Sequence, residues 1–599
     1  MKKLLIHNNN TCLVDPEYFS VNEQYVFDLT TLDGEIDSEL HSNLVSGEIG
    51  RTIKKCDLLF IKLSLSSNYL EYLGLRLAYH IRLTKELGDK TRIPIIIIAE
   101  EDINFIGRTS NLGSLLLTKG TYLIKDNPHA YETILNDWKE NLISSASEKK
   151  IFIDQIHLPK PANYSSHHNI DNELSLLMWS DSLGIIDQLD LSKLNFINTL
   201  YYKYIRGKSI SPASEIFTEN KSKSKGKVLL IDDDAIKGWY RFYNEFFNRY
   251  FPDVDLIDCD VKFENKNQLE LIDMVDNKIN KIKPDLVLLD LRLCEEDFDP
   301  KCKPENLSGF LVAEIVKKLN RGTQIIITTA SNKIWNFSVF NKFGTINYLL
   351  KTYSLDLDKQ FEDFSTFIEN GLERSAFLKL VFSKLKYIKK QLKILKNKKE
   401  IIEDFRKKIE NHLDTCFALL EKSLNEPGYR NHAYLQLYFI LEDLTNCEAF
   451  FKEGEVCKVF ISKTETVVVL RKKNEKEFES PIEWNKKKKK YIFSKSIYNT
   501  YNSRLEMNIK MQLIILFRYG GDSIAIKKWK DLNWIRNNKA GHSGDKDLVN
   551  KDDVELILEF IQFVFDSKNV NTKNKLKSLD ASEDDKKKAL LEKYNKKNH

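Results

Sequence analysis

Three consecutive aspartates, residues 232–234, directly follow a four-residue apolar run, and single polar residues end three later runs of the same kind. Asp290 follows the run at 286–289, and Thr329 and Lys351 stand at the ends of the next two. In an open parallel sheet, residues just past the carboxyl ends of the strands converge on one crevice. The sequence therefore predicts that these side chains, far apart in the chain, share one pocket.

This set of side chains suits the transfer of a phosphoryl group to a carboxylate. Two carboxylates, Asp232 and Asp233, can hold Mg²⁺, which prefers oxygen ligands. A third, Asp290, can attack phosphorus as the nucleophile. The ammonium of Lys351 and the hydroxyl of Thr329 can neutralise and orient the phosphoryl oxygens. The alternative is an ordinary α/β domain in which aspartates at strand ends only cap helices.

A strand–helix series between residues 226 and 372 would position these side chains. Its clearest strands are the runs at 228–231, 286–289, 325–327 and 348–350. Alternation of strands with helical patterns favours a parallel sheet covered by helices on both faces. We therefore expect an α/β domain with its pocket at the carboxyl edge of the sheet.

The pocket motifs closely resemble those of the receiver domains of response regulators, the phosphoproteins of two-component signalling. The resemblance runs through residues 231–234, 285–290, 308–310, 328–330 and 343–351. It implies a flavodoxin-like doubly wound fold, Mg²⁺ as the cofactor, and a histidine kinase or another phosphoryl donor as a partner. Two departures concern activation, since the loop at 291–307 is long for the family and Thr352 replaces the usual proline.

The same resemblance assigns a role to each pocket residue. It makes Asp290 the phosphoacceptor and, together with Asp232 and Asp233, a magnesium ligand. The carbonyl of Arg292 would be a further metal ligand. The switch residues implied by the resemblance are Thr329, Tyr348 and Lys351.

The first 140 residues carry a similar strand–helix pattern without the chemistry. Lys62 ends the strand that parallels the one before Asp290, and residues 7–9 (His-Asn-Asn) replace the acidic triplet. Only residues 120–125 keep the receiver ending, with Lys125 as its last residue. A lysine cannot accept phosphate in this role, and without carboxylates there is no magnesium cage. We interpret this region as a degenerate pseudo-receiver that binds protein; the alternative is an anion site at Lys62 and Lys125.

Arg536 and His542 form a second candidate site near the C-terminus. A helix that ends around Arg536 would leave both side chains exposed on one rim beyond its end. A guanidinium can grip a phosphodiester at two points, and a histidine can shuttle a proton near neutral pH. This pair is sufficient in principle for metal-free RNA cleavage, in which the 2′-hydroxyl attacks the adjacent phosphate.

The spacing of Arg536 and His542, with Asn537 after the arginine, resembles the motif of the HEPN family (higher eukaryotes and prokaryotes nucleotide-binding). These proteins are helical bundles. The resemblance covers residues 400–568 and implies a homodimer with both motifs in one cleft, an endoribonuclease that needs no cofactor, and a further polar residue, Glu442 or Asp443. The alternatives are an inactive docking module and an arginine that merely caps a helix.

An uninterrupted basic run lies inside a β-branched, Lys-rich insertion at about 456–493, where we expect a hairpin. Its cations could bind RNA phosphates while Trp484 and Tyr491 stack on bases. Equally, lysines commonly protect an exposed strand edge from aggregation. The residues of the run are Lys486, Lys487, Lys488, Lys489 and Lys490.

Composition bounds the class of protein. Hydrophobic residues make up 42% and charged residues 30%, and no apolar run approaches the roughly 20 residues that a membrane helix needs. The eight cysteines form no CxxC pair, which favours reduced thiols. The N-terminal residues lack the apolar stretch of a signal peptide. We therefore expect a cytoplasmic protein without membrane segments; a net charge of +5 is too small to indicate a partner.

The expected fold class is a multidomain chain with α/β and all-α parts: two flavodoxin-like receiver folds, then a HEPN-like helical bundle with a small β insertion. Expected helices in the last part lie at 377–398, 401–424, 434–451, 498–519, 524–536 and 552–566. The expected boundaries are 1–140 for the pseudo-receiver, 141–225 for a helical connector and polar linker, 226–372 for the receiver, 373–399 for a second connector, 400–568 for the helical domain, and 569–599 for a polar tail.

Together these patterns predict a phosphorylation-regulated protein whose C-terminal domain is a metal-independent endoribonuclease. A ribonuclease of this family joined to a sensory module fits bacterial toxin or antiviral defence systems, by family association. The rival prediction is a phosphorylation-dependent scaffold with an inactive HEPN-like interaction module. A transcriptional regulator is disfavoured, because no helix-turn-helix pattern follows the receiver.

Overall fold

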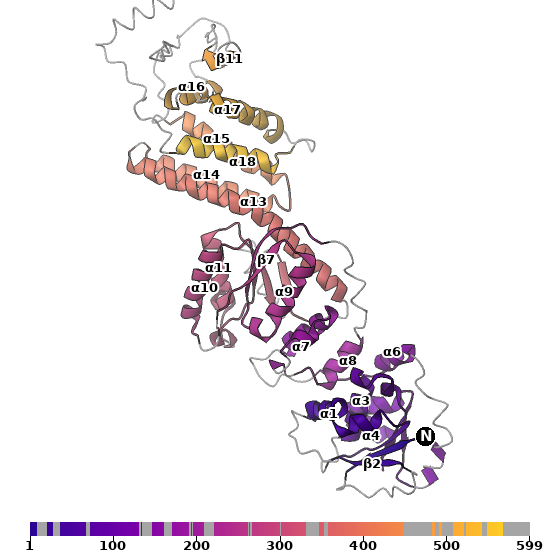
Figure 1. Cartoon of the computed structure of the whole chain (residues 1–599). Helices are drawn as coiled ribbons and strands as arrows, with labels where there is room; N and C mark the ends of the chain where they lie inside the picture. Colours follow the sequence, from indigo (N-terminus) through magenta and orange to yellow (C-terminus); the bar gives the residue numbers. More distant parts are fainter. Residues whose placement is uncertain are drawn as a thin grey trace, which may run out of the picture. The chain divides into compact units, whose positions relative to one another are not determined.

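A computed structural model of the chain divides into two compact units, residues 1–312 with 325–369 and residues 313–324 with 370–599. Figure 1 shows the helices and strands of both units. Among the described residues, no helix is both long and apolar enough to cross a membrane. The structure describes residues 1–566 except 9–20, 28–35, 67–71, 128, 131–132, 135–145, 161–169, 191–192, 195, 209–220, 262, 264–265, 300, 331–346, 353–356, 400, 448–481, 486–489, 494–506, 520–522 and 542–547.

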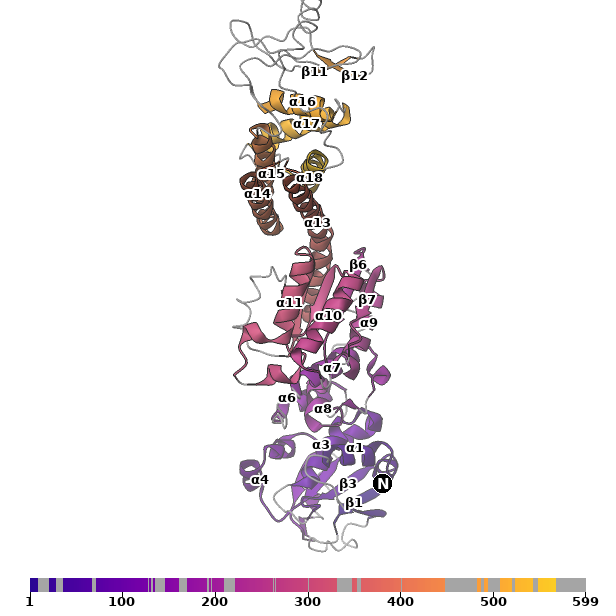
Figure 2. The same cartoon turned by 90° about the vertical axis from the view of Figure 1, so that its left-hand side faces the viewer.

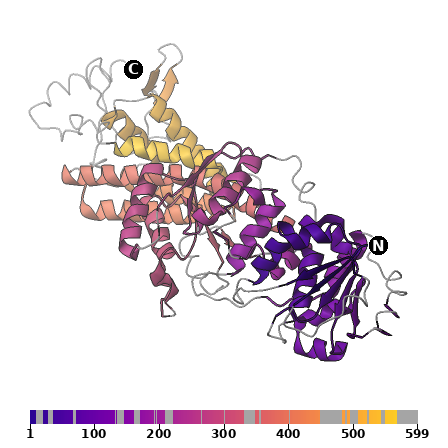
Figure 3. The same ribbon diagram turned by 60° about the horizontal axis from the view of Figure 1, so that its bottom comes forward.

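The N-terminal sheet is parallel, with the strand order β2-β1-β3-β4-β5. This is the flavodoxin-like order. The sheet lies in the indigo part of Figure 3. Its central strands form because continuous apolar runs such as Ile95–Ile98 are buried on both faces. The strands are β1 (Lys3–His7), β2 (Glu23–Val26), β3 (Leu58–Lys62), β4 (Ile95–Ile98) and β5 (Thr121–Ile124). The helices are α1 (Ile36–Val45), α2 (Glu48–Ile53), α3 (Leu73–Leu83) and α4 (Ile103–Thr109), with 3₁₀ segments at Lys85–Arg92 and Asn111–Leu117.

A connector follows, formed by α6 (Ala146–Gln155), α7 (Ile170–Ser182), a 3₁₀ turn (Ile186–Gln188) and α8 (Leu200–Lys208). Helix α8 packs on α3 through a buried polar cluster. Asp37 accepts hydrogen bonds from the Leu200 amide (2.9 Å) and from His80 Nε2 (2.9 Å). Lys203 Nζ lies 2.8 Å from His80 Nδ1, and burial lowers the pKa of Lys203 to about 7. The cluster ties the connector to the first sheet domain.

The second sheet domain repeats the strand order of the first, β10-β9-β8-β6-β7, and its β6–β7, β6–β8 and β9–β10 pairs are parallel. Helices α10 and α11 cover one face of the sheet and α9 the other (Figure 1). The strands are β6 (Gly226–Ile231), β7 (Val254–Asp258), β8 (Leu286–Leu289), β9 (Gln324–Thr329) and β10 (Asn347–Leu350). The helices are α9 (Trp239–Tyr250), α10 (Gln268–Ile282) and α11 (Ser308–Leu319), with 3₁₀ turns at Ala235–Lys237, Glu295–Phe298 and Pro304–Asn306.

Helix α13 (Leu357–Asn397) begins in the first unit, where Phe361 and Phe364 pack on the aromatic face of α9. The rest of α13 belongs to the second unit, which is mainly helical (Figure 2). Its other helices are α14 (Glu403–Lys422), α15 (Tyr429–Thr445), α16 (Met507–Arg518), α17 (Ser523–Ile535) and α18 (Lys551–Phe565), and its hairpin is β11 (Ile482–Asn485) with β12 (Lys490–Phe493).

The helices of the second unit form because their apolar residues recur at helical spacing and meet in one core. Trp529 of α17 is the centre of a stack, with Tyr438 of α15 at 5.9 Å and Phe560 of α18 at 6.1 Å between ring centroids. The expected hairpin forms at β11 and β12, while residues 456–481 of the expected insertion lie outside the described residues.

Candidate functional site

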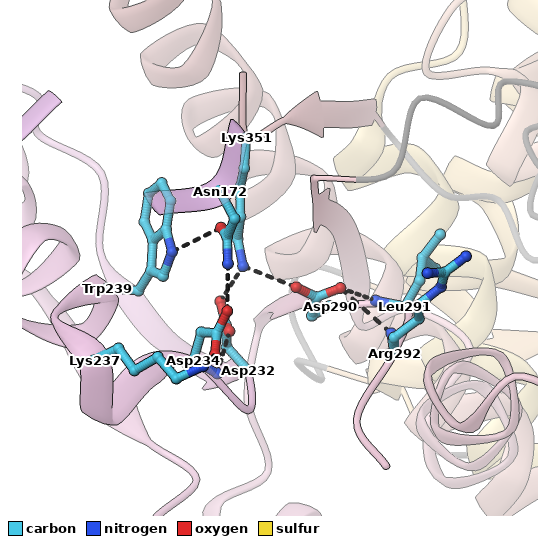
Figure 4. Close-up of polar contacts among 9 residues, drawn as sticks. All are labelled: Asn172, Asp232, Asp234, Lys237, Trp239, Asp290, Leu291, Arg292 and Lys351. Atoms are coloured by element: carbon cyan, nitrogen blue, oxygen red, sulfur yellow. Dashed lines mark hydrogen bonds and ion pairs between the residues drawn. The ribbon is translucent and has the colours of Figure 1, made fainter. Parts of the chain in front are cut away.

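Lys351 lies at the centre of the pocket that the second sheet forms at its carboxyl edge (Figure 4). Its side chain is fully buried, and its Nζ lies 2.6 Å from Asp232 Oδ2 and 2.8 Å from Asp290 Oδ2. The pocket forms because β6, β8 and β10 end at the same edge, directly before these three residues. Burial disfavours the ammonium, but Asp232 and Asp290 outweigh it and raise the pKa of Lys351.

Three carboxylates gather beside this ammonium. One oxygen each of Asp232, Asp233 and Asp290 lie within 4.8 Å of one another. Burial raises the pKa of Asp232 to about 7, with further increases from Asp290 and Asp234, while Lys351 opposes them. Burial and the charge of Asp234 also hold the pKa of Asp233 well above its ordinary value. A buried cluster that resists carrying its full negative charge, with only oxygen donors, fits a hard divalent cation such as Mg²⁺.

The other oxygen of Asp290 is held by the backbone. Asp290 Oδ1 accepts hydrogen bonds from the amides of Leu291 (2.5 Å) and Arg292 (3.3 Å). The Oδ2 atom is the one that contacts the Lys351 ammonium (2.8 Å). A Cβ on Gly309 would lie 2.3 Å from the carbonyl oxygen of Asp290, so this position requires glycine.

The third aspartate of the triplet, Asp234, is tied outward. Its carboxylate forms an ion pair with Lys237 (2.6 Å) and accepts a hydrogen bond from Asn172 of the connector. Its amide donates to Asp232 Oδ1 (3.0 Å) and so fixes that carboxylate. Asn172 was not among the residues predicted from the sequence.

The predicted switch residues lie on the neighbouring strands. Thr329 ends β9, is buried, and accepts a hydrogen bond at its carbonyl from the Lys351 amide (2.8 Å). Tyr348, on β10, is half-buried, and burial together with the negative charge of Asp290 raises its pKa. The structure therefore places Thr329 with the predicted pocket residues at the carboxyl edge of the sheet, while Tyr348 lies within β10, opposite Ile327 of β9.

The long loop at 291–307 is organised by a buried carboxylate, Asp297. It accepts hydrogen bonds from the amides of Leu293 (2.8 Å) and Ser308 (2.8 Å) and from the Ser308 hydroxyl. A cleft of about 1290 Å³ beside the acidic triplet is lined by residues 293–296 and 298 of this loop and by residues 188–190 of the connector. The insertion thus forms one wall of the approach to the pocket.

At the corresponding edge of the first sheet, the described residues differ from those of the acidic pocket. Lys62 ends β3, and its Nζ lies 2.7 Å from Asp126, which follows β5. In the first sheet the lysine thus ends the middle strand and the aspartate follows the last strand, whereas in the second sheet Asp290 follows the middle strand and Lys351 follows the last one. Lys125 is exposed, and Lys62 is paired with a carboxylate, which argues against an anion site between the two lysines. Among the described residues, the carboxylate cluster of the second sheet has no counterpart here.

At the C-terminal candidate site, helix α17 ends at Ile535, one residue before Arg536, close to the expected helix end. A π-helical turn follows directly at Arg536–Ala540, which the Gly541 amide closes by donating to the Arg536 carbonyl (2.9 Å). The wide turn persists because Ala540 is buried and Lys539 forms an ion pair with Asp553 of α18 (2.7 Å).

Arg536 itself is exposed, and its guanidinium lies 5.7 Å from the centroid of the Tyr438 ring. It also donates to Asn537 Oδ1 (2.9 Å), while the Tyr438 hydroxyl donates to Asn533 (2.9 Å). Burial raises the pKa of Tyr438 to about 12, with Arg536 acting against the increase and Glu442 with it. Tyr438 and Asn533 carry no sequence motif and were not predicted.

The two acidic candidates on α15 have different surroundings. Glu442 lies close enough to Tyr438 to affect its pKa. Asp443 instead pairs with α14, through Lys408 (2.6 Å) and His412 (3.3 Å). Only Glu442 therefore lies on the Arg536 side of the helix.

Several predicted residues lie outside the part of the chain that the structure describes. These are His542, residues 486–489 of the lysine run and the tail at 569–599. Lys490 begins β12, but its side chain is not described.

Comparison with known families agrees with the interpretation of the first sheet domain. Residues 16–124 match the family model of the inactive receiver domain. The match covers four of its strands, β2 to β5, and the substitution of Lys62 for the phosphoacceptor is consistent with it. No curated protein matches the chain. The N-terminal part of the chain is thus similar to inactive receivers, as its degenerate pocket predicted.

Proposed function

We propose that the second sheet domain is a receiver that takes a phosphoryl group on Asp290 from a histidine kinase or another phosphoryl donor. The observation that carries this proposal is the buried ammonium of Lys351, which bridges Asp290 and Asp232. Asp290 Oδ2 forms the new bond to phosphorus while the bond from phosphorus to the donor breaks and the donor leaves with its electron pair.

Other residues of the pocket would bind the metal, stabilise the phosphoryl group and orient Asp290. Asp232 and Asp233 would hold Mg²⁺, which neutralises charge on the phosphoryl oxygens when bound. Lys351 is positioned to stabilise the negative charge of the added phosphoryl group, because its ammonium already contacts the oxygen of Asp290 that accepts this group. The amides of Leu291 and Arg292 orient Asp290 through its other oxygen.

The test is the intact mass of the full chain incubated with acetyl phosphate and Mg²⁺. We expect a gain of one phosphoryl group that is lost in Asp290→Asn and in EDTA. A gain that persists undiminished in Asp290→Asn would reject Asp290 as the acceptor.

We further propose that the helical unit is a HEPN-like endoribonuclease that acts without a metal, through Arg536, Asn537 and His542. Support comes from the exposed guanidinium of Arg536, which Tyr438 and Asn537 hold at the start of a π-helical turn. Such turns are frequent at functional sites. The RNA 2′-hydroxyl would form the new bond to phosphorus while the bond from phosphorus to the 5′-oxygen of the next nucleotide breaks. Arg536 would stabilise the charge that develops on the phosphate, and His542 would transfer a proton in this step. The lysine run at 486–490 would add RNA contacts.

The competing proposal is a phosphorylation-dependent scaffold with an inactive helical module. It is favoured by the match to inactive receivers, since a receiver domain without chemistry is suited to binding proteins. Cleavage of RNA in EDTA by the wild type and not by His542→Ala separates the two. Intact RNA with both proteins, phosphorylated or not, would favour the scaffold.

A further inference from the structure

Asn172 of the connector contacts the acidic pocket with both ends of its side-chain amide (Figure 4). Its Oδ1 accepts a hydrogen bond from Trp239 Nε1 (2.9 Å), and its Nδ2 donates to Asp234 Oδ2. Trp239 begins α9, and Asp234 follows β6 by three residues. One side chain from outside the sheet domain thus fixes two elements that frame the pocket.

Trp239 extends this contact to the phosphoacceptor. The Lys351 ammonium lies 4.9 Å from the centroid of the Trp239 ring, which is 1% exposed. A cation over a buried indole face is attracted by the ring. The chain of contacts therefore runs from Asp290 to Lys351, to Trp239 and then to Asn172.

Helix α7 is itself held firmly against the domain. Trp179 is fully buried and packs edge-on against Trp239 (5.4 Å) and against Phe361 of α13 (5.8 Å). Gly238, between the acidic triplet and α9, has a φ of +132°, and an added Cβ would lie 3.1 Å from Leu176 of α7. Glycine is required there both for the backbone conformation and for the close approach of the connector.

We propose that Asn172 is a positioning residue of the Asp290 site and that α7 thereby responds to occupancy of that site. With Lys237, Asn172 holds Asp234 outward, so that Asp232 and Asp233 are the carboxylates left to bind Mg²⁺. When a phosphoryl group draws the Lys351 ammonium toward itself, the contact between Lys351 and Trp239 changes, and Asn172 receives that change. This inference rests on the proposed function of Asp290 and adds a route from the pocket to the connector.

The test uses the full chain and two readouts, the Kd for Mg²⁺ without any phosphoryl donor and amide hydrogen exchange of residues 170–182. For Asn172→Ala we expect Mg²⁺ binding about tenfold weaker, as for loss of one hydrogen bond to a charged group. Mg²⁺ binding should be weaker still in Asn172→Asp, because a carboxylate can accept a hydrogen bond from Trp239 but repels Asp234. Trp239→Phe keeps an aromatic ring beside Lys351 but removes the Nε1 donor and one ring of the indole, and we expect an intermediate loss of Mg²⁺ affinity.

The matched control is Asp181→Asn on the same helix. Asp181 pairs with Arg206 of α8 (2.6 Å), so this change loosens α7 without touching the pocket, and Mg²⁺ binding should stay within about twofold of wild type. Mg²⁺ with beryllium fluoride should alter exchange of residues 170–182 in wild type and in the control but not in Asn172→Ala. The proposal would be overturned if Asn172→Ala binds Mg²⁺ as tightly as wild type and shows the same change in hydrogen exchange as wild type when beryllium fluoride is added.

The two proposals fail differently. A wild-type protein that binds Mg²⁺ but gains no phosphoryl mass refutes the function of Asp290 and leaves the Asn172 effect on Mg²⁺ affinity standing. Normal phosphorylation, with equal Mg²⁺ affinities and equal exchange responses in wild type and all three pocket variants, refutes the role of Asn172 alone.

Discussion

Replacing Lys351 with methionine removes the cation that lies between two buried carboxylates and keeps the side chain's approximate length. The ammonium lies 2.6 Å from Asp232 and 2.8 Å from Asp290, and its own side chain is 0% exposed. Loss of one partner from a buried ion pair costs about 3–5 kcal/mol, because the remaining charge is left without compensation. For a domain of this size, that corresponds to a fall in melting temperature of about 10 °C.

The size of this effect should depend on pH. Burial raises the pKa of Asp232 to about 7, above its value of about 3.9 in an unfolded chain. The folded state therefore keeps a proton that the unfolded state releases, and this contribution to stability is lost as the pH rises through about 7. Without Lys351 the pKa of Asp232 rises further, so Lys351→Met should destabilise the protein most above pH 7 and least near pH 5.

The assay is thermal unfolding of the full chain at pH 5 and pH 8, with and without Mg²⁺. Added Mg²⁺ should recover more stability in Lys351→Met than in wild type, because it compensates the carboxylates that the lysine has left. Lys62→Met is the control, since it breaks an ion pair with Asp126 in the first sheet domain and should give no Mg²⁺ response. A larger loss at pH 5 than at pH 8, or equal Mg²⁺ responses in both variants, would refute the reasoning.

Three further predictions concern other parts of the chain. His542→Ala should reduce the rate of metal-free RNA cleavage by about 10²–10⁴, and Arg536→Lys should also lose cleavage activity. The upstream product should carry a 2′,3′-cyclic phosphate or a 3′-phosphate. Strict metal dependence, or products with a 5′-phosphate, would point to another catalytic group. The helical unit should mediate a homodimer when RNA is cut, and light scattering that finds only monomer under those conditions would contradict a composite site. Burial lowers the pKa of Lys203 to about 7, so above pH 7 the unfolded chain binds a proton that the folded chain does not, and the free energy of unfolding should rise with pH. In Lys203→Met this rise should be absent. The same dependence of the free energy of unfolding on pH in wild type and Lys203→Met would contradict the assignment.

The pocket could be predicted from sequence because each of its residues ends an apolar strand. A run such as Leu286–Leu289 is buried on both faces of a parallel sheet, and the polar residue that follows must then lie at the carboxyl edge. The same reasoning identified Lys62 as the residue that replaces the phosphoacceptor in the first sheet domain. At these strands the apolar run in the sequence is enough to place the polar residue that follows it in the fold.

Elements without such a pattern were missed. The edge strands β2 and β7 include exposed and polar residues, so neither presents an apolar run. Asn172 lies on a helix outside the sheet domain, and its contact with Asp234 follows from tertiary packing around Trp179. Sequence spacing alone carries no information on such contacts.

The π-helical turn that follows α17 was not predicted from the sequence, for a related reason. Two asparagines and a later glycine favour a helix end, but burial of Ala540 and the ion pair of Lys539 with Asp553 keep the chain helical in a wider turn. Tertiary contacts outweighed local propensity at this position.

The decisive measurement is the mass of the intact chain, followed by peptide mapping, after incubation with acetyl phosphate and Mg²⁺. We predict one phosphoryl group, located on Asp290, absent in Asp290→Asn and absent from residues 1–140, where Lys62 occupies the equivalent strand end. A wild-type chain that remains unmodified while it binds Mg²⁺, or a phosphoryl group that maps to any other residue, would contradict the proposed function.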